Sequence, residues 1–144
     1  MDNYQLITDT SLNRSETKIL LEKKGYQLVA DDNDLNRMVI KILLEKNGYL
    51  IDEVANGNEV IDKIKTGVHK YSVIWLDIEM PEMDGIECAL KLRNDLNYTG
   101  TIIGITSHVD FESLNTGTLS GMDTVLSKPI SEISLINAIK LFSN

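Results

Sequence analysis

The sequence predicts an α/β fold, in which helices cover both faces of a doubly wound parallel sheet of five strands. From Tyr26 onward, short apolar runs alternate with amphipathic helical patterns, as expected of successive βαβ units. The run Val73–Leu76 carries no charge and is rich in β-branched and aromatic residues, which indicates a strand buried on both faces. Crossovers between such strands are right-handed, so the strands should run parallel with helices on either face.

The elements follow one another along the chain in strict alternation. The strands are predicted at residues 26–31, 49–54, 72–77, 101–106 and 123–127. The helices are predicted near residues 34–47, 57–66, 84–96, 110–120 and 132–142. The helical pattern at 110–120 is the least regular, because it contains four poor helix formers, Asn115, Thr116, Gly117 and Thr118. That helix would therefore depend on packing and move easily.

The chain opens with a partial repeat of the first predicted strand and helix. The segment Tyr4–Arg14 recurs as Tyr26–Arg37 with one residue inserted, and Lys18–Tyr26 recurs as Lys41–Tyr49. Each copy has the pattern of a strand, a turn and an amphipathic helix closed by a glycine.

The repeat divides the chain into an N-terminal extension, residues 1–25, and a main domain, residues 26–144. Only the main domain carries the adjacent acids Asp31 and Asp32, because the first copy has Thr10 in place of the second acid. The extension either packs on the surface or frays, or it competes for the sheet position of the second copy, within or between chains. We favour the first interpretation, because exchange of elements between chains is the rarer outcome.

The totals favour a single globular domain in a reducing compartment. With 144 residues, 42% of them apolar and 25% charged, the chain can bury a sizeable core. A formal net charge of −8 argues against nucleic-acid binding, which needs a basic face. No apolar run approaches the ~20 residues of a membrane span, and the N-terminus lacks the pattern of a signal peptide. Cys88 is the only cysteine, which favours a cytoplasmic location.

Four predicted strands end on a polar group that can do chemistry. The first ends at Asp31 and Asp32, the third at Asp77, the fourth at Thr106 and the fifth at Lys128. The carboxyl ends of parallel strands meet at one edge of the sheet, where ligands usually bind. We therefore expect these groups to converge, although they lie far apart in the sequence.

This set of groups suits phosphoryl transfer. Three carboxylates held close together repel one another, and a bound divalent cation relieves that repulsion. Oxygen ligands with room for water suit Mg²⁺ better than zinc. A carboxylate such as Asp77 can accept a phosphoryl group as an acyl phosphate. Lys128 would neutralise charge on that group, and Thr106 would offer it a hydroxyl donor.

The same residues, in this order, resemble the receiver domain of two-component response regulators. The motifs that carry the resemblance are Asp31-Asp32, Asp77 with Met80–Gly85, Thr106-Ser107 and Lys128-Pro129. They span the chain from Tyr26 to near its C-terminus, and together they are far more specific than any one of them alone. The resemblance implies a flavodoxin-like sheet with strand order 2-1-3-4-5.

The resemblance also implies roles for the acids. Asp77 would take a phosphoryl group from a phosphohistidine on a histidine kinase or phosphotransfer protein. Asp31, Asp32 and Asp77 would bind Mg²⁺ together with the backbone carbonyl of Glu79.

By the same resemblance, Lys128 would pair with the phosphoryl group and its peptide bond to Pro129 would be cis, while Thr106 would turn toward the phosphoryl group as the switch. The phosphorylated domain would then bind a downstream effector through the face of its last two strands and helices. Such a domain catalyses only its own phosphorylation and dephosphorylation, so it is a regulatory phosphoacceptor and not a conventional enzyme.

The sequence departs from the family pattern in two places. Three residues before the Lys-Pro pair the family usually has an aromatic residue that swings inward, and here Val125 has little reach. The N-terminal repeat is the second departure. Glu79 and His108 occupy positions that by resemblance tune dephosphorylation, although two exposed loop side chains would account for them equally well. Trp75 and Cys88 are assigned to the core.

Three alternative functions remain open. A haloacid-dehalogenase-like hydrolase also forms an aspartyl phosphate, but it has a second Asp where this chain has Glu79, and a cap domain. A flavodoxin-like cofactor binder needs a phosphate loop after the first strand, where Asp31 and Asp32 would repel the phosphate. A receiver-like interaction module that is never phosphorylated is disfavoured by the intact set of five residues.

Overall fold

The computed structural model describes residues 25–143, so the N-terminal repeat and Asn144 lie outside the described residues. The strands are β1 (Tyr26–Ala30), β2 (Leu50–Val54), β3 (Tyr71–Asp77), β4 (Thr101–Thr106) and β5 (Thr124–Ser127). The helices described are α3 (Asp34–Lys46), α4 (Gly57–Thr66), α5 (Gly85–Asn94), α6 (Phe111–Leu119) and α7 (Glu132–Phe142). The strands form one parallel sheet in the order β2-β1-β3-β4-β5, which confirms the predicted fold class and strand order.

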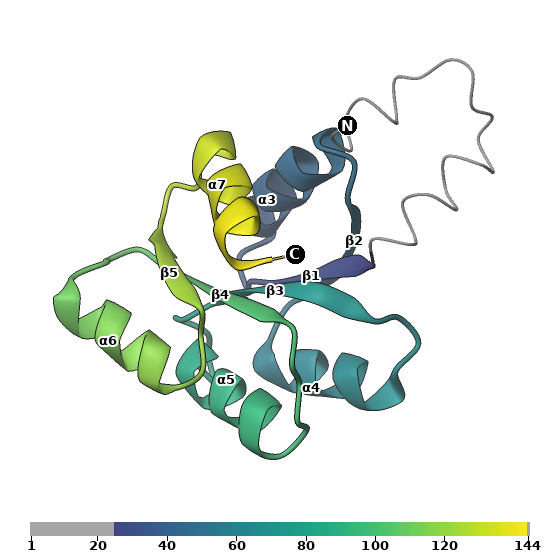
Figure 1. The fold of residues 1–144 in the computed structure, drawn as a ribbon, viewed down its shortest axis with the longest axis vertical. Helices are drawn as coiled ribbons and strands as arrows, with labels where there is room; N and C mark the ends of the chain where they lie inside the picture. Colours follow the sequence, from purple (N-terminus) through teal and green to yellow (C-terminus); the bar gives the residue numbers. More distant parts are fainter. Residues whose placement is uncertain (1–24, 144) are drawn as a thin grey trace.

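Helices cover both faces of this sheet. Figure 1 shows α3 and α7 on one face and α4, α5 and α6 on the other. Neighbouring strand residues point to opposite faces, so Ile74 packs in the cluster with Leu92 of α5, whereas Trp75 packs in the cluster with Leu44 of α3. Cys88 is buried, as predicted. Within residues 25–143, no helix combines the length and the apolar character needed to cross a membrane.

Two local features explain why α6 forms despite its poor helix formers. Its first turn is closed by a capping box, in which the Asp110 side chain accepts from the Ser113 backbone N–H and the Ser113 hydroxyl accepts from the Asp110 N–H. Its last turns lie close to β5, because a Cβ atom on Gly117 would stand 2.6 Å from a methyl carbon of Val125. The glycine that weakens the helix therefore permits its packing, and the buried Val125 fills the space beside it.

A buried polar pair links the two central strands β1 and β3. The indole Nε1 of Trp75 donates to Oε1 of Gln27 over 2.8 Å, and both side chains are almost fully buried. The sequence predicts Trp75 as core, but gives no sign of its partner. A buried donor that loses its acceptor is costly, so this pair helps to fix which residues of β1 and β3 lie opposite one another.

We predict that Gln27→Met, which keeps the volume but removes the acceptor, lowers the free energy of unfolding by about 1–3 kcal/mol, because the Trp75 N–H is left unsatisfied. The measurement is urea denaturation followed by circular dichroism. In a Trp75→Phe background, the same change should cost much less, because the donor is gone. Equal costs in both backgrounds would show that the pair contributes nothing.

Candidate functional site

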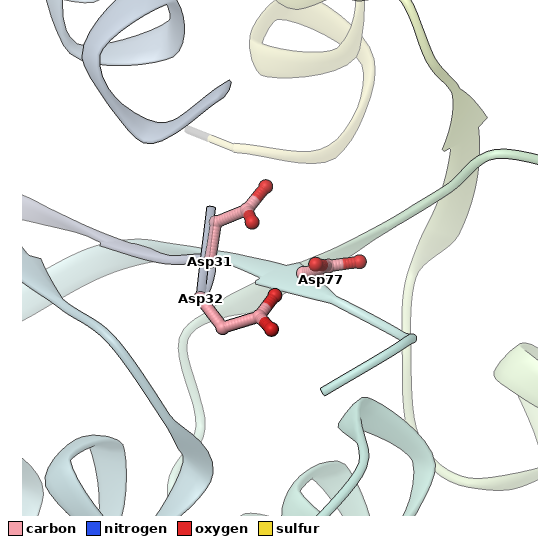
Figure 2. Close-up of side chains that lie close together, drawn as sticks. All are labelled: Asp31, Asp32 and Asp77. Carbon is pink, nitrogen blue, oxygen red and sulfur yellow. The ribbon is translucent and has the colours of Figure 1, made fainter. Parts of the chain in front are cut away.

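Three aspartates meet at the carboxyl edge of the sheet. Asp31 and Asp32 follow the last residue of β1, and Asp77 is the last residue of β3 (Figure 2). One carboxylate oxygen from each lies within 4.8 Å of the others. Asp31 and Asp77 are buried and Asp32 is exposed. They converge because β1 and β3 are parallel neighbours in register, with Ala30 opposite Leu76.

The turn after β1 is built to hold Asp31. Its Oδ1 accepts from the Asn33 N–H over 2.8 Å, and the Asn33 side chain in turn caps α3 by accepting from the Asn36 N–H. From the first turn of that helix, Arg37 reaches back and donates to the Asp31 carbonyl over 2.6 Å. The predicted role of Asp31 did not include this support. The one sign of this contact in the sequence is that the repeat keeps an arginine at the position of Arg37, which is Arg14 in the first copy.

The ammonium group of Lys128 contacts two of these acids. Its Nζ lies 3.2 Å from Oδ1 of Asp77 and 3.5 Å from Oδ2 of Asp31. The backbone positions it, because the Lys128 N–H donates to the Thr106 carbonyl over 2.8 Å and so ties the end of β5 to β4. The Lys128–Pro129 peptide bond is cis, as the resemblance implies.

Thr106 lies at the same edge, but its hydroxyl points to a different partner. The buried Thr106 side chain donates to the carboxylate of Glu79, and Ser107 donates to the same oxygen. We expected only the backbone carbonyl of Glu79 to matter as a ligand, so this side-chain contact was missed. His108 is not drawn into the site, because its exposed ring pairs with Asp110 at 3.3 Å.

Burial and charge oppose ionisation of Asp77. Burial, and then the neighbouring Asp31, raise the pKa of Asp77 to about 7, while Lys128 works in the other direction. Burial tends to lower the pKa of Lys128, but Asp77 and Asp31 outweigh burial and raise it. Glu79 differs, because hydrogen bonds, chiefly from Thr106, outweigh its burial and lower its pKa. The three carboxylates thus outnumber the Lys128 ammonium that contacts them.

This imbalance fits a hard divalent cation. Among the described residues, Asp31 Oδ2 is the buried side-chain oxygen that lacks a hydrogen-bond partner. It belongs to the same three-carboxylate group, and all-oxygen ligands with one exposed member that leaves room for water suit Mg²⁺. The residues present thus meet the requirements of a magnesium site.

Comparison with known proteins decides the family. The family model for the response regulator receiver domain matches residues 27–140. This chain belongs to the receiver family of two-component signalling systems. It is 34% identical over 136 residues to the osmosensing histidine protein kinase SLN1 of Saccharomyces cerevisiae. That match covers 92% of this chain but only 11% of the kinase.

Solved receivers share the fold. The receiver domain of the Francisella response regulator 1452 matches with a TM-score of 0.74 and 32% identity, over 81% of this chain and 94% of that one. The chemotaxis protein CheY4 of Vibrio cholerae matches with a TM-score of 0.75 and 25% identity, over 82% of this chain and 98% of that one. Both matches leave uncovered a fraction of this receiver similar in size to its N-terminal extension.

We predict that, in metal-free buffer, Asp77→Asn is as stable as the wild type near pH 4 and more stable above about pH 7, by on the order of 3 kcal/mol. The folded-state pKa of Asp77, about 7, lies above its unfolded value. Folded protein therefore binds the extra proton between these values, and the stability from Asp77 is lost as the pH rises. Urea denaturation across this range measures the difference.

Other carboxylates make the free energy of unfolding depend on pH in the opposite direction. Their contribution is the same in mutant and wild type, so it cancels when the two proteins are compared. Addition of Mg²⁺ should reduce the difference in stability between mutant and wild type at high pH, because a bound cation would stabilise the ionised wild-type carboxylates. If the free energies of unfolding of mutant and wild type differ by the same amount at every pH, the raised pKa of Asp77 is contradicted.

Proposed function

We propose that this receiver takes a phosphoryl group from a phosphohistidine of a histidine kinase or phosphotransfer protein onto Asp77. The observation that carries the proposal is the position of the Asp77 carboxylate, which lies beside Asp31 and Asp32 and 3.2 Å from the Lys128 ammonium. In the transfer, a carboxylate oxygen of Asp77 forms the new P–O bond. The P–N bond to the donor imidazole breaks, and the imidazole nitrogen keeps the bonding electron pair.

The neighbouring groups would supply charge and orientation. Asp31, Asp32, Asp77 and the backbone carbonyl of Glu79 would hold a Mg²⁺ ion, which neutralises charge on the phosphoryl oxygens when bound. Lys128 would pair with the same oxygens from the other side, since it already contacts the acceptor. In the phosphorylated protein, the Thr106 hydroxyl would turn toward the phosphoryl group.

A shallow groove beside the site supports a docking position for the phosphodonor. The groove encloses about 140 Å³ and runs from Leu35 and Val39 on α3 to Pro129 and Ile130 in the loop before α7. Leu35 and Val39 are exposed although apolar. Lys128, which contacts Asp77, also lines the groove, so a helix seated there would bring a donor histidine close to Asp77.

The face formed by α6, β5 and α7 supports a second contact, with a downstream effector. Leu119 of α6 and Ile133 and Leu141 of α7 each leave about three quarters of their surface exposed. Exposed apolar side chains on the two helices that flank β5 in the sequence suit protein binding. We therefore propose a regulatory phosphoacceptor that acts by partner binding in the cytoplasm, where a single buried thiol such as Cys88 stays reduced.

We also propose that residues 26–144 form the functional domain and that residues 1–25 are an added extension. Deleting residues 1–24 should leave a monomer whose melting temperature differs little from that of the full chain, because residues 26–142 supply the five strands and five helices of the receiver fold and the family model matches residues 27–140. Differential scanning calorimetry and light scattering provide the measurements. A dimer that becomes a monomer on deletion would instead support exchange of the repeated element between chains.

Small phosphodonors test the acceptor directly. With acetyl phosphate and Mg²⁺, we expect one alkali-labile phosphate per chain, and none in Asp77→Asn. In Lys128→Ala and Asp32→Asn, the rate of phosphate incorporation should fall by about tenfold or more. Asp62→Asn is the matched control, because Asp62 is an exposed acid on α4 away from this edge. Labelling that persists in Asp77→Asn, or steady turnover of a generic phosphate ester, would contradict the proposal.

A further inference from the structure

We propose that the carboxylate of Glu79 is a positioning group that holds the Thr106 hydroxyl in the unphosphorylated protein and must be displaced when Asp77 is phosphorylated. This inference rests on the proposed function, since it concerns how that site is switched. It gives the Glu79 side chain a task distinct from that of its backbone carbonyl.

Three donors from the end of β4 converge on one oxygen of Glu79. Its Oε1 accepts from the Thr106 hydroxyl and, at 3.3 Å each, from the backbone N–H and the hydroxyl of Ser107. The backbone of Glu79 is tied to the acceptor as well, because its N–H donates to Asp77 Oδ1 over 3.1 Å. One residue thus connects the phosphorylation site to the segment that leads into α6.

The hydrogen bond from Thr106 to Glu79 is incompatible with a hydrogen bond from Thr106 to a phosphoryl group on Asp77. A hydroxyl has one proton to donate, and Thr106 gives it to Glu79. The Thr106 oxygen also accepts from the His108 N–H at 3.4 Å, so both its donor and an acceptor position are in use within this loop. The same hydroxyl cannot donate to a phosphoryl oxygen until the bond to Glu79 breaks.

Charge provides the means of release. A phosphoryl group carries about −1.5 to −2 charges and would stand on Asp77, two residues from the ionised Glu79. The two negative groups repel, and the phosphoryl oxygens offer the hydroxyl a strong alternative acceptor. Phosphorylation would therefore weaken the hold and compete for the same proton at once, freeing Thr106 and Ser107 together.

The first test measures binding of beryllofluoride, a phosphoryl mimic, in the presence of Mg²⁺. Glu79→Ala should bind it about threefold to tenfold more tightly than the wild type, because no bond to Thr106 has to be broken. Glu79→Gln should fall between the two, since its amide oxygen still accepts a hydrogen bond. Glu82→Gln is the matched control, because it removes the same charge from an exposed acid of the same loop.

A double-mutant cycle separates the hold from simple charge repulsion. In a Thr106→Val background, which lacks the hydroxyl, Glu79→Ala should change the affinity for beryllofluoride little. An increase that persists in full there, or an equal increase in Glu82→Gln, would overturn the inference. Thermal melting of the Glu79 and Glu82 variants should stay near that of the wild type, since both residues are exposed.

The second test needs no phosphoryl mimic. In amide NMR spectra of the unmodified protein, Glu79→Ala should shift the Ser107 amide proton strongly, because that N–H loses its acceptor, whereas Glu82→Gln should leave it in place. An unmoved Ser107 signal would overturn the inference even if the protein is phosphorylated normally. The two proposals can fail separately. If the wild type does not respond to beryllofluoride but Glu79→Ala still shifts the Ser107 amide, the proposed function is refuted, whereas the contact of Glu79 with the end of β4 is confirmed.

Discussion

The structure depends on one unbalanced arrangement of charge, in which the buried carboxylates of Asp31 and Asp77 share the ammonium of Lys128. One cation cannot neutralise two buried acids, and burying a charge without full compensation is unfavourable. The acids cannot move apart, because β1 and β3 are central strands whose neighbouring residues are packed on both faces. The apolar core therefore holds the edge in a state that an added divalent cation would relieve.

The opposite end of the sheet shows what the same kind of residue does when its carboxylate is well hydrogen-bonded. Asp52 accepts from the Tyr71 hydroxyl over 2.6 Å and contacts His69 at 2.8 Å, and the His69 ring stacks on Tyr26. Burial tends to raise the pKa of Asp52, but these hydrogen bonds outweigh it and lower the pKa, opposite to Asp77. One end of the sheet thus ties strands together with satisfied polar groups, while the other gathers three carboxylates beside one another.

Prediction from sequence succeeded where a pattern follows from backbone geometry and failed where it depends on side-chain direction. The apolar runs locate the strands, and parallel strands place Asp77 and Lys128 at one edge whatever their rotamers. The partner of Trp75 and the partner of the Thr106 hydroxyl have no such periodicity. Each is set by how a single side chain turns in three dimensions, so Gln27 and Glu79 could be identified as these hydrogen-bond partners only from the structure.

Comparison of the two copies of the repeat distinguishes the residues that pack the first strand from the acids that form the cluster at its end. Tyr26, Gln27 and Leu28, which contact His69, Trp75 and the core, have identical counterparts in Tyr4, Gln5 and Leu6. Asp32, by contrast, is exposed and belongs to the cluster of acids, and its counterpart is Thr10. A copy that retains the packing residues and lacks the second acid cannot assemble the three-carboxylate site. Asp32 is therefore not required by the packing of the strand, and the three-carboxylate cluster depends on the second copy.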